Sequence, residues 1–279
     1  MIDSFKGICI FAYGRSGSTL LCEQLANALK VKHQLNTKSL YEILTPHCVL
    51  TPDFKELAVD MTGLNERPFR TSLDLYRLER VEDIISSEIF PIFKIFSSDM
   101  THDNKDVMDR LIVNNPNIFK ISLNRADVVN QYLSWMISCA TGVWHHYDFD
   151  DLNHTIVKNN GYTDDRSIPP SNKHNADLNY AKYIASGVLL HYMWHFEVGY
   201  KKCNQTVWYD QLFNTDYPEL GISKSDLIES QLKMNESHIE TLYQCFKNAD
   251  DILNIAKRLE SSVKPMLDIL RPDLNHYRT

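Results

Sequence analysis

The 279-residue sequence lacks long hydrophobic runs, internal repeats and low-complexity tracts. No apolar stretch reaches the roughly 20 residues that a membrane-spanning helix needs, and no basic stretch with an apolar core marks a signal peptide. We therefore expect a cytoplasmic protein without a membrane partner. An excess of basic residues is also missing, because the formal net charge is −7, and this argues against a nucleic-acid partner.

Paired cysteines and clustered metal ligands are missing as well. The six cysteines are scattered without any Cys-x-x-Cys pair, which predicts reduced thiols in the core rather than a disulfide framework. His145 and His146 are adjacent, and adjacent residues do not share a helix face, so we predict no metal site. Hydrophobic residues make up 43% of the chain and charged residues 23%, which is typical of a globular protein.

Four short apolar runs alternate with helical patterns along the chain. The runs at residues 7–12, 92–96, 118–123 and 206–208 predict buried strands. The patterns at residues 18–29, 106–114, 127–140 and 178–200 predict helices. Strands that alternate with helices are typical of a central parallel sheet covered on both faces. The predicted fold class is therefore α/β, with a helical C-terminal part.

The length suits one α/β domain with additions or two small domains. We expect a single domain over residues 1–279, with an α/β core at 5–215 and a helical extension at 216–279. Two stretches, 45–83 and 159–175, are rich in loop-forming residues and have little periodicity. We expect both to be loops on the substrate side of the domain.

The segment ICIFAYGRSGSTLL at residues 8–21 is the most informative stretch. It predicts a buried strand, a tight turn at Gly14 and Gly17, and a helix that follows. The start of such a helix directs backbone N–H groups and the positive end of the helix dipole at one point, which suits a phosphate. A Walker loop would place a lysine directly after its last glycine, but Ser18 and Thr19 follow Gly17 here. The cation of this loop is Arg15.

A second candidate anion site follows the run at residues 118–123. Arg125 stands at the expected carboxyl end of that strand, where open α/β sheets bind ligands. The next helix carries Gln131 and Ser134 on roughly one face. An arginine fork with a serine hydroxyl suits a phosphate, although Arg125 alone could simply cap the helix or pair with Asp127. Two anion sites at strand ends suit a nucleotide with phosphates at both ends.

The loop YGRSGSTLL at residues 13–21 resembles the 5′-phosphosulfate loop of sulfotransferases, and Arg125 with Ser134 resembles their 3′-phosphate pair. The nearest resemblance is to the bacterial trehalose 2-sulfotransferase family. The pattern Arg-x-Asp-Val-Val-x-Gln-x-x-Ser at residues 125–134 is similar to the second motif of that family, and it continues to Thr-Gly-Val-Trp at residues 141–144.

Two further features fit the same family. Glu23 follows the loop, and WYDQL at residues 208–212 is similar to a Tyr-Glu-Asp-Leu signature. The resemblance covers approximately residues 5–30 and 90–215. It implies the P-loop sulfotransferase fold, a central parallel sheet flanked by helices.

The resemblance implies that the chain is a sulfotransferase. Its donor would be 3′-phosphoadenosine 5′-phosphosulfate, its acceptor a hydroxyl of a carbohydrate or another small molecule, and no metal would be required. Arg15 would neutralise the departing 5′-phosphate as a catalytic residue. A symmetric homodimer is the common assembly of soluble oligomers and stays open here. The implied donor-binding residues are Gly14, Arg15, Ser16, Gly17, Ser18, Thr19, Leu20, Arg125 and Ser134.

Transfer to a hydroxyl also benefits from a general base. Many cytosolic sulfotransferases have a histidine two residues after a strand lysine, but a phenylalanine stands two residues after Lys94. The trehalose-type family uses a carboxylate shortly after the first helix, whereas the segment KHQLN at residues 32–36 has none. We predict that the base is His33 or Glu42, with His47 just downstream.

Lys94 and Trp144 are predicted to contact the acceptor, Lys94 from a strand end and Trp144 from the start of an acidic loop. Two alternatives to a sulfotransferase stay open. A P-loop kinase or NTPase with a degenerate loop would bind ATP with magnesium. A nucleotide-binding homologue that has lost catalysis would bind the donor without turnover, and the missing carboxylate after the first helix agrees with it.

Overall fold

The computed structural model describes residues 2–42, 48–50, 56–58, 85–86, 88–96, 109–141, 173, 175–228 and 238–272. The chain divides into two compact units. The first unit contains Met1–Ala126, Leu190–Leu232 and Met266–Thr279, and the second contains Asp127–Leu189 and Lys233–Pro265. Each unit is therefore discontinuous in sequence, and the single domain with its division at residue 215 stays a prediction.

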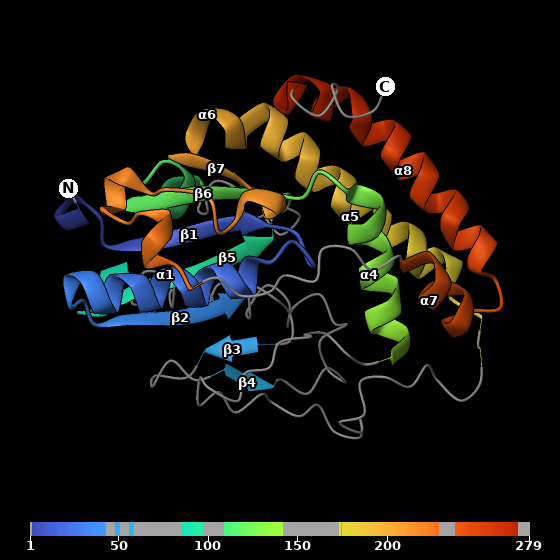
Figure 1. Cartoon of the computed structure of the whole chain (residues 1–279), viewed down its shortest axis with the longest axis horizontal. Coiled ribbons are helices and arrows are strands. Elements are labelled where there is room, and N and C mark those ends of the chain that lie inside the picture. The colour runs from blue at the N-terminus through green and yellow to red at the C-terminus, as the bar shows by residue number, and fades with distance from the viewer. Residues whose placement is uncertain are drawn as a thin grey trace. The chain divides into compact units, whose positions relative to one another are not determined.

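A five-stranded parallel sheet forms the centre of the first unit (Figure 1). Its strands are, in sheet order, β2 (Thr37–Glu42), β5 (Phe90–Phe96), β1 (Gly7–Ala12), β6 (Ile118–Asn124) and β7 (Gln205–Trp208). This confirms the predicted α/β class. All four predicted strands lie in the sheet, and β2 is an edge strand that the sequence analysis missed. A separate antiparallel pair consists of β3 (Cys48–Leu50) and β4 (Glu56–Ala58).

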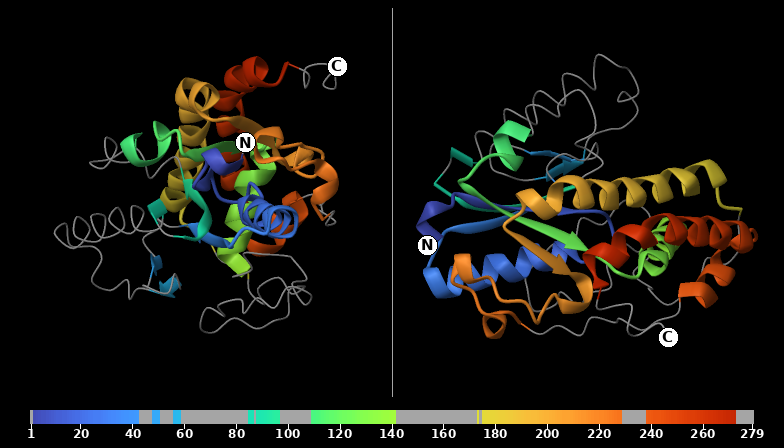
Figure 2. Two further views of the ribbon diagram at one scale, coloured as in Figure 1. Left: turned by 90° about the vertical axis from the view of Figure 1, so that its left-hand side faces the viewer. Right: turned by 90° about the horizontal axis from the view of Figure 1, so that it is seen from above.

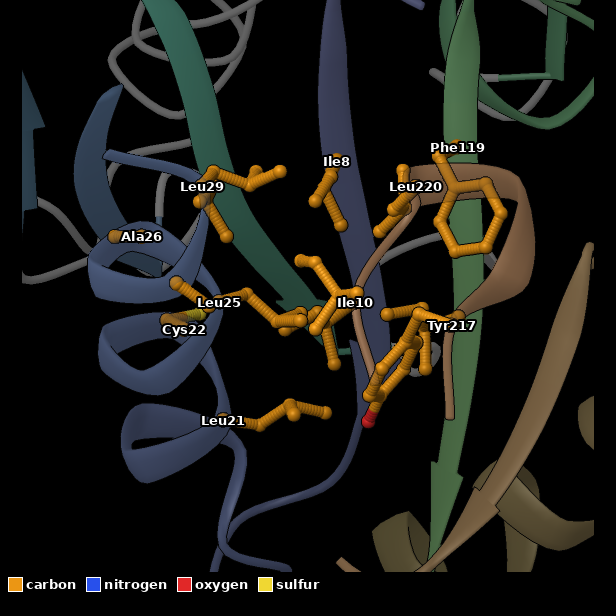
Figure 3. Packing of buried hydrophobic residues seen from close by; sticks show 14 of the residues in the cluster. Ile8, Ile10, Leu21, Cys22, Leu25, Ala26, Leu29, Phe119, Tyr217 and Leu220 are labelled. Carbon is orange, nitrogen blue, oxygen red and sulfur yellow. The ribbon is translucent and has the colours of Figure 1, made fainter. Parts of the chain in front are cut away.

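Both faces of this sheet are covered. Helix α1 (Ser18–His33) runs alongside the strands (Figure 2), and its Leu21 and Leu25 pack against Ile8 and Ile10 of β1 (Figure 3). The alternate residues of β1 point to the opposite face, where Phe11 lies 4.6 Å from the ring of Trp194. Each of the fully buried Leu, Ile and Phe side chains in these contacts stabilises the fold by about 1.5–3 kcal/mol.

Short π-helical segments cover this second face. They are Asp109–Val113 and His195–Gly199, and their buried apolar neighbours include Phe93 and Ile95. The sequence predicted a helix at 106–114 and one long helix at 178–200. The structure instead has α5 (Leu178–Trp194), the π segment and a short α6 (Tyr200–Lys202). Residues 106–108 lie outside the described residues.

The second unit is helical. It contains α4 (Val128–Thr141), the first part of α5, α7 (His238–Cys245) and most of α8 (Ala249–Leu270). Helices α4 and α7 pack together, and Trp135 donates a hydrogen bond to the Tyr180 hydroxyl at 3.4 Å. The expectation that the C-terminal part is helical is confirmed. Within the predicted loop at 45–83, the described residues form the strands β3 and β4 instead. The rest of that stretch and nearly all of 159–175 lie outside the described residues.

The order of the strands determines where a ligand can bind. From β1 the chain passes through α1 to β2 on one side of the sheet, whereas β6 is followed by β7 on the other side. The crevice beyond the carboxyl ends of β1 and β6 is therefore the topological switch point, which is the usual ligand site of open parallel sheets. The loop after β1 and Arg125 after β6 both lie at this edge of the sheet.

Candidate functional site

The connection from β1 to α1 has an unusual backbone. Residues 13–17 separate Ala12 from Ser18, and two of them have positive φ, 66° at Arg15 and 82° at Gly17. A non-glycine residue in this left-handed region is uncommon and is found often at functional sites. Gly17 is the N-cap of α1 and provides no side-chain hydrogen bond. The first N–H groups of α1 therefore face this loop without a side-chain cap, which suits a bound anion.

Space as well as conformation requires a glycine at position 17. A Cβ atom there would lie 2.8 Å from two ring carbons of Tyr209 and 3.2 Å from Leu212 Cδ1. Such distances are too short for carbon atoms that are not bonded, so an alanine would force the ring away. The aromatic ring that follows β7 therefore lies directly over the glycine turn.

Lys94 extends from β5 to the first turn of α1. Its ammonium group donates a hydrogen bond of 2.7 Å to Thr19 Oγ1, and the residue is only 5% exposed. The sequence analysis predicted Lys94 as an acceptor contact, and that role stays a prediction. The sequence did not reveal that β5, the strand next to β1, places a lysine at the start of α1. Lys94 therefore provides an ammonium group near the loop, where a Walker loop would have its lysine after the last glycine.

Arg125 reaches the same loop from β6. Its Nη1 donates a hydrogen bond of 3.2 Å to the carbonyl oxygen of Arg15, and its guanidinium lies 4.6 Å from the ring centroid of Tyr209. The Tyr192 hydroxyl accepts a hydrogen bond from the Arg125 N–H at 3.2 Å and donates one to the Arg125 carbonyl. Contacts therefore fix both the backbone and the guanidinium of Arg125. The Asp127 carboxylate accepts hydrogen bonds from Asn130, as a helix cap does.

The predicted bases lie at different ends of the sheet. His33 is the last residue of α1, and its Nε2 lies 2.9 Å from the carbonyl oxygen of Leu220. At about 1.5 Å per residue, α1 separates His33 from Ser18 by roughly 22 Å, far beyond hydrogen-bond reach. The structure therefore argues against His33 as the base. Glu42 ends β2 at the carboxyl edge, where its backbone is in register with Lys94.

The place of the remaining predicted site residues relative to this loop stays a prediction. Ser134 is a buried residue of α4 in the second unit, and its carbonyl accepts a hydrogen bond from the Ser138 hydroxyl at 2.8 Å. Its pairing with Arg125 stays a prediction. His47 and Trp144 lie outside the described residues.

A buried polar cluster that the sequence analysis missed lies on β6 just before Arg125. The Ser122 hydroxyl is 2.6 Å from His195 Nδ1 and 3.3 Å from Asn124 Nδ2. The ring of His195 meets Trp208 edge-on at 6.2 Å. Ser122 and Asn124 follow Lys120 as alternate polar residues on the same side of β6. Alternate polar residues in a buried strand were the signal from which a polar cluster could have been predicted. The partner His195 could not be predicted in this way, because it lies 73 residues away in the sequence.

Burial keeps two histidines of this region neutral. Desolvation lowers the pKa of His195 to about 4, and desolvation together with the nearby His195 lowers the pKa of His191 to about 3. Because both folded-state values lie below the usual histidine value, the unfolded chain takes up these protons first as the pH falls. We expect stability to be full above pH 6.5 and to fall from pH 6.5 to about 4 for His195 and to about 3 for His191, by up to about 1.4 kcal/mol per pH unit for each histidine.

Urea unfolding at pH 5 and pH 7 measures this effect. The variant His195→Asn keeps a polar group near Ser122 and removes one titrating site, so its stability should depend less steeply on pH. An unchanged pH slope in this variant would contradict a neutral, buried His195.

One pocket lies at the opposite edge of the sheet. It is lined by Lys6, Leu35, Asn36, Glu88, Ile89 and Phe90, at the amino ends of β1 and β5. None of the loop residues lines this pocket. We therefore place the candidate site at the carboxyl edge, because the loop geometry and the cations Lys94 and Arg125 meet there.

Neither a metal site nor a membrane span is found in the described part of the chain. Its histidine, cysteine and acidic residues form no group of three that could hold a metal ion. Its helices include none with both the length and the apolar character to cross a membrane. Comparisons with known proteins return no matching family model, no matching curated protein and no matching solved structure.

Proposed function

We propose that this chain is a sulfotransferase that moves a sulfuryl group from 3′-phosphoadenosine 5′-phosphosulfate to a hydroxyl of a carbohydrate or another small acceptor. The observation that carries the proposal is the hydrogen bond between Lys94 and Thr19. This contact favours the proposal over a magnesium-dependent NTPase.

The position of Thr19 supports this preference. In a Walker loop the second residue after the last glycine supplies the hydroxyl that binds Mg²⁺. Thr19 is the second residue after Gly17, and a lysine ammonium group lies 2.7 Å from its hydroxyl. An ammonium group beside that hydroxyl repels a divalent metal and provides positive charge in its place. The arrangement therefore supports group transfer without a metal.

The residues of the loop fit a donor with a phosphate at each end. The donor, when bound, supplies a sulfuryl group on a phosphate leaving group. The uncapped N–H groups at the start of α1 would hold the 5′-phosphate, and Arg15 and Lys94 would stabilise the charge that develops on it. Arg125 would bind the 3′-phosphate, because it lies against the same loop and its guanidinium has further N–H donors.

Glu42 is the base that we propose for the acceptor hydroxyl. It ends the strand next to β5, in backbone register with Lys94, so it lies at the ligand-binding edge of the sheet. A cytoplasmic location is part of the proposal. It is supported by five free cysteines, Cys9, Cys22, Cys139, Cys203 and Cys245, which suit a reducing compartment.

Calorimetric titration with adenosine 3′,5′-bisphosphate, in buffer with a metal chelator, tests the proposal. We expect metal-independent binding, followed by transfer of label from radioactive donor to at least one member of a panel of sugars and small alcohols. Absence of binding at high micromolar concentration would overturn the proposal. Binding of ATP that requires magnesium would favour the kinase or NTPase, and donor binding without any transfer would favour a homologue without catalysis.

A further inference from the structure

Tyr209 contacts both halves of the candidate site. It is the first residue of the 3₁₀ turn Tyr209–Gln211 that follows β7. One contact is with Gly17, where an added Cβ atom would lie 2.8 Å from the ring. The other is with Arg125, whose guanidinium carbon lies 4.6 Å from the ring centroid. All three residues belong to the first unit.

We propose that Tyr209 is a positioning residue that holds Arg125 against the glycine turn and so couples the two phosphate subsites. This inference rests on the proposed function, in which Arg125 binds the 3′-phosphate. Neither the sequence motifs nor the loop itself assigns such a role to this tyrosine.

The physical reason is that an aromatic face can hold a cation without neutralising it. The guanidinium is attracted by the negative face of the ring, and its N–H groups at the edge stay directed outward. Within the described residues Arg125 has no acidic partner, and Nη1 already bonds the carbonyl oxygen of Arg15. Among the described residues, the groups that fix the Arg125 guanidinium are thus a carbonyl oxygen and an aromatic face, and neither of them neutralises its charge.

A second arginine at the same sheet edge also stacks on an aromatic ring but has a carboxylate partner. Arg271 lies 4.9 Å from the ring centroid of Trp208, the residue before Tyr209. Its guanidinium also bonds both carboxylate oxygens of Asp210, at 3.3 and 3.4 Å. Arg271 is thus paired with a carboxylate, whereas the contacts of Arg125 within the described residues are to a carbonyl oxygen and an aromatic ring.

The coupling predicts a selective effect of removing the ring. The variant Tyr209→Met keeps apolar volume over Gly17 but removes the aromatic face. It should weaken binding of adenosine 3′,5′-bisphosphate by about tenfold and change binding of adenosine 5′-monophosphate by less than about twofold. Tyr209→Phe should behave as the wild type, because the face is kept. The control Tyr200→Met removes an exposed tyrosine of the same unit and should change neither affinity.

Calorimetry on the full chain with both nucleotides tests the coupling. In the background of Arg125→Ala, Tyr209→Met should cause no further loss of selectivity for the 3′-phosphate. If Tyr209→Met does not fold, pentafluorophenylalanine at position 209 keeps the shape and reverses the charge of the ring face, and it should reproduce the selective loss.

The outcomes separate this inference from the proposed function. If the wild type binds neither nucleotide, the proposed function fails, and the inference fails with it. If the wild type prefers the bisphosphate but Tyr209→Met weakens both nucleotides equally, only the role of Tyr209 is overturned. A selective loss that persists in the Arg125→Ala background would likewise overturn it.

Discussion

Replacing Lys94 by methionine is expected to lower the rate of the proposed sulfuryl transfer by about 10²–10³-fold. Methionine keeps the apolar stem of the side chain in the buried strand, but it removes the ammonium group that bonds Thr19 at 2.7 Å. That ammonium lies at the start of α1, where charge on the departing phosphate would develop. The rate constant with radioactive donor and the affinity for adenosine 3′,5′-bisphosphate measure the effect, and the affinity can be measured before any acceptor is identified.

Lys120 offers a matched control for this variant. It is a second buried lysine of the parallel sheet, and burial lowers its pKa. Its ammonium donates to the carbonyl oxygens of Asn115 at 2.7 Å and Ile118 at 2.9 Å, near the amino end of β6. Lys120→Met should reduce stability and leave nucleotide affinity of the folded protein unchanged. Similar losses of affinity in the two variants would mean that Lys94 acts only through packing.

The fold class was predictable because strands buried on both faces of a parallel sheet are nearly continuous apolar runs. The segment GICIFA of β1 is such a run, and every one of its residues is buried. The edge strand β2, with the sequence TKSLYE, mixes polar and apolar residues and gave no such signal. Its membership in the sheet depends on pairing with β5, about 50 residues later in the sequence, which no local pattern reveals.

The difference between local patterns and long-range pairing also explains which parts of the candidate site could be predicted. The glycine turn and the place of Arg125 follow from local rules, since each comes directly after a buried strand. The contact between Lys94 and Thr19 depends on β5 lying beside β1, and a sequence without strand order cannot give it. The distance of His33 from the loop was, by contrast, predictable, because a helix of 16 residues places its two ends at opposite edges of the sheet.

Replacing Arg125 by alanine is expected to remove the preference for a 3′-phosphate. The affinity for adenosine 3′,5′-bisphosphate should fall by about 10- to 100-fold, as expected for loss of hydrogen bonds to a charged group. The affinity for adenosine 5′-monophosphate should fall much less, because only the bond to the carbonyl oxygen of Arg15 is lost at the turn. Arg125→Lys should be intermediate, since an ammonium is a point charge without the planar fork.

Arg271→Ala is the matched control, because Arg271 also stacks on an aromatic ring at the end of β7 but is paired with Asp210. It should lower stability and leave the ratio of the two affinities unchanged. The comparison isolates the charge of Arg125, since both variants remove a guanidinium from the same edge of the sheet. An equal loss for both nucleotides in Arg125→Ala would show that Arg125 supports the loop and does not meet a 3′-phosphate, because an effect through the loop cannot distinguish ligands that share the 5′-phosphate.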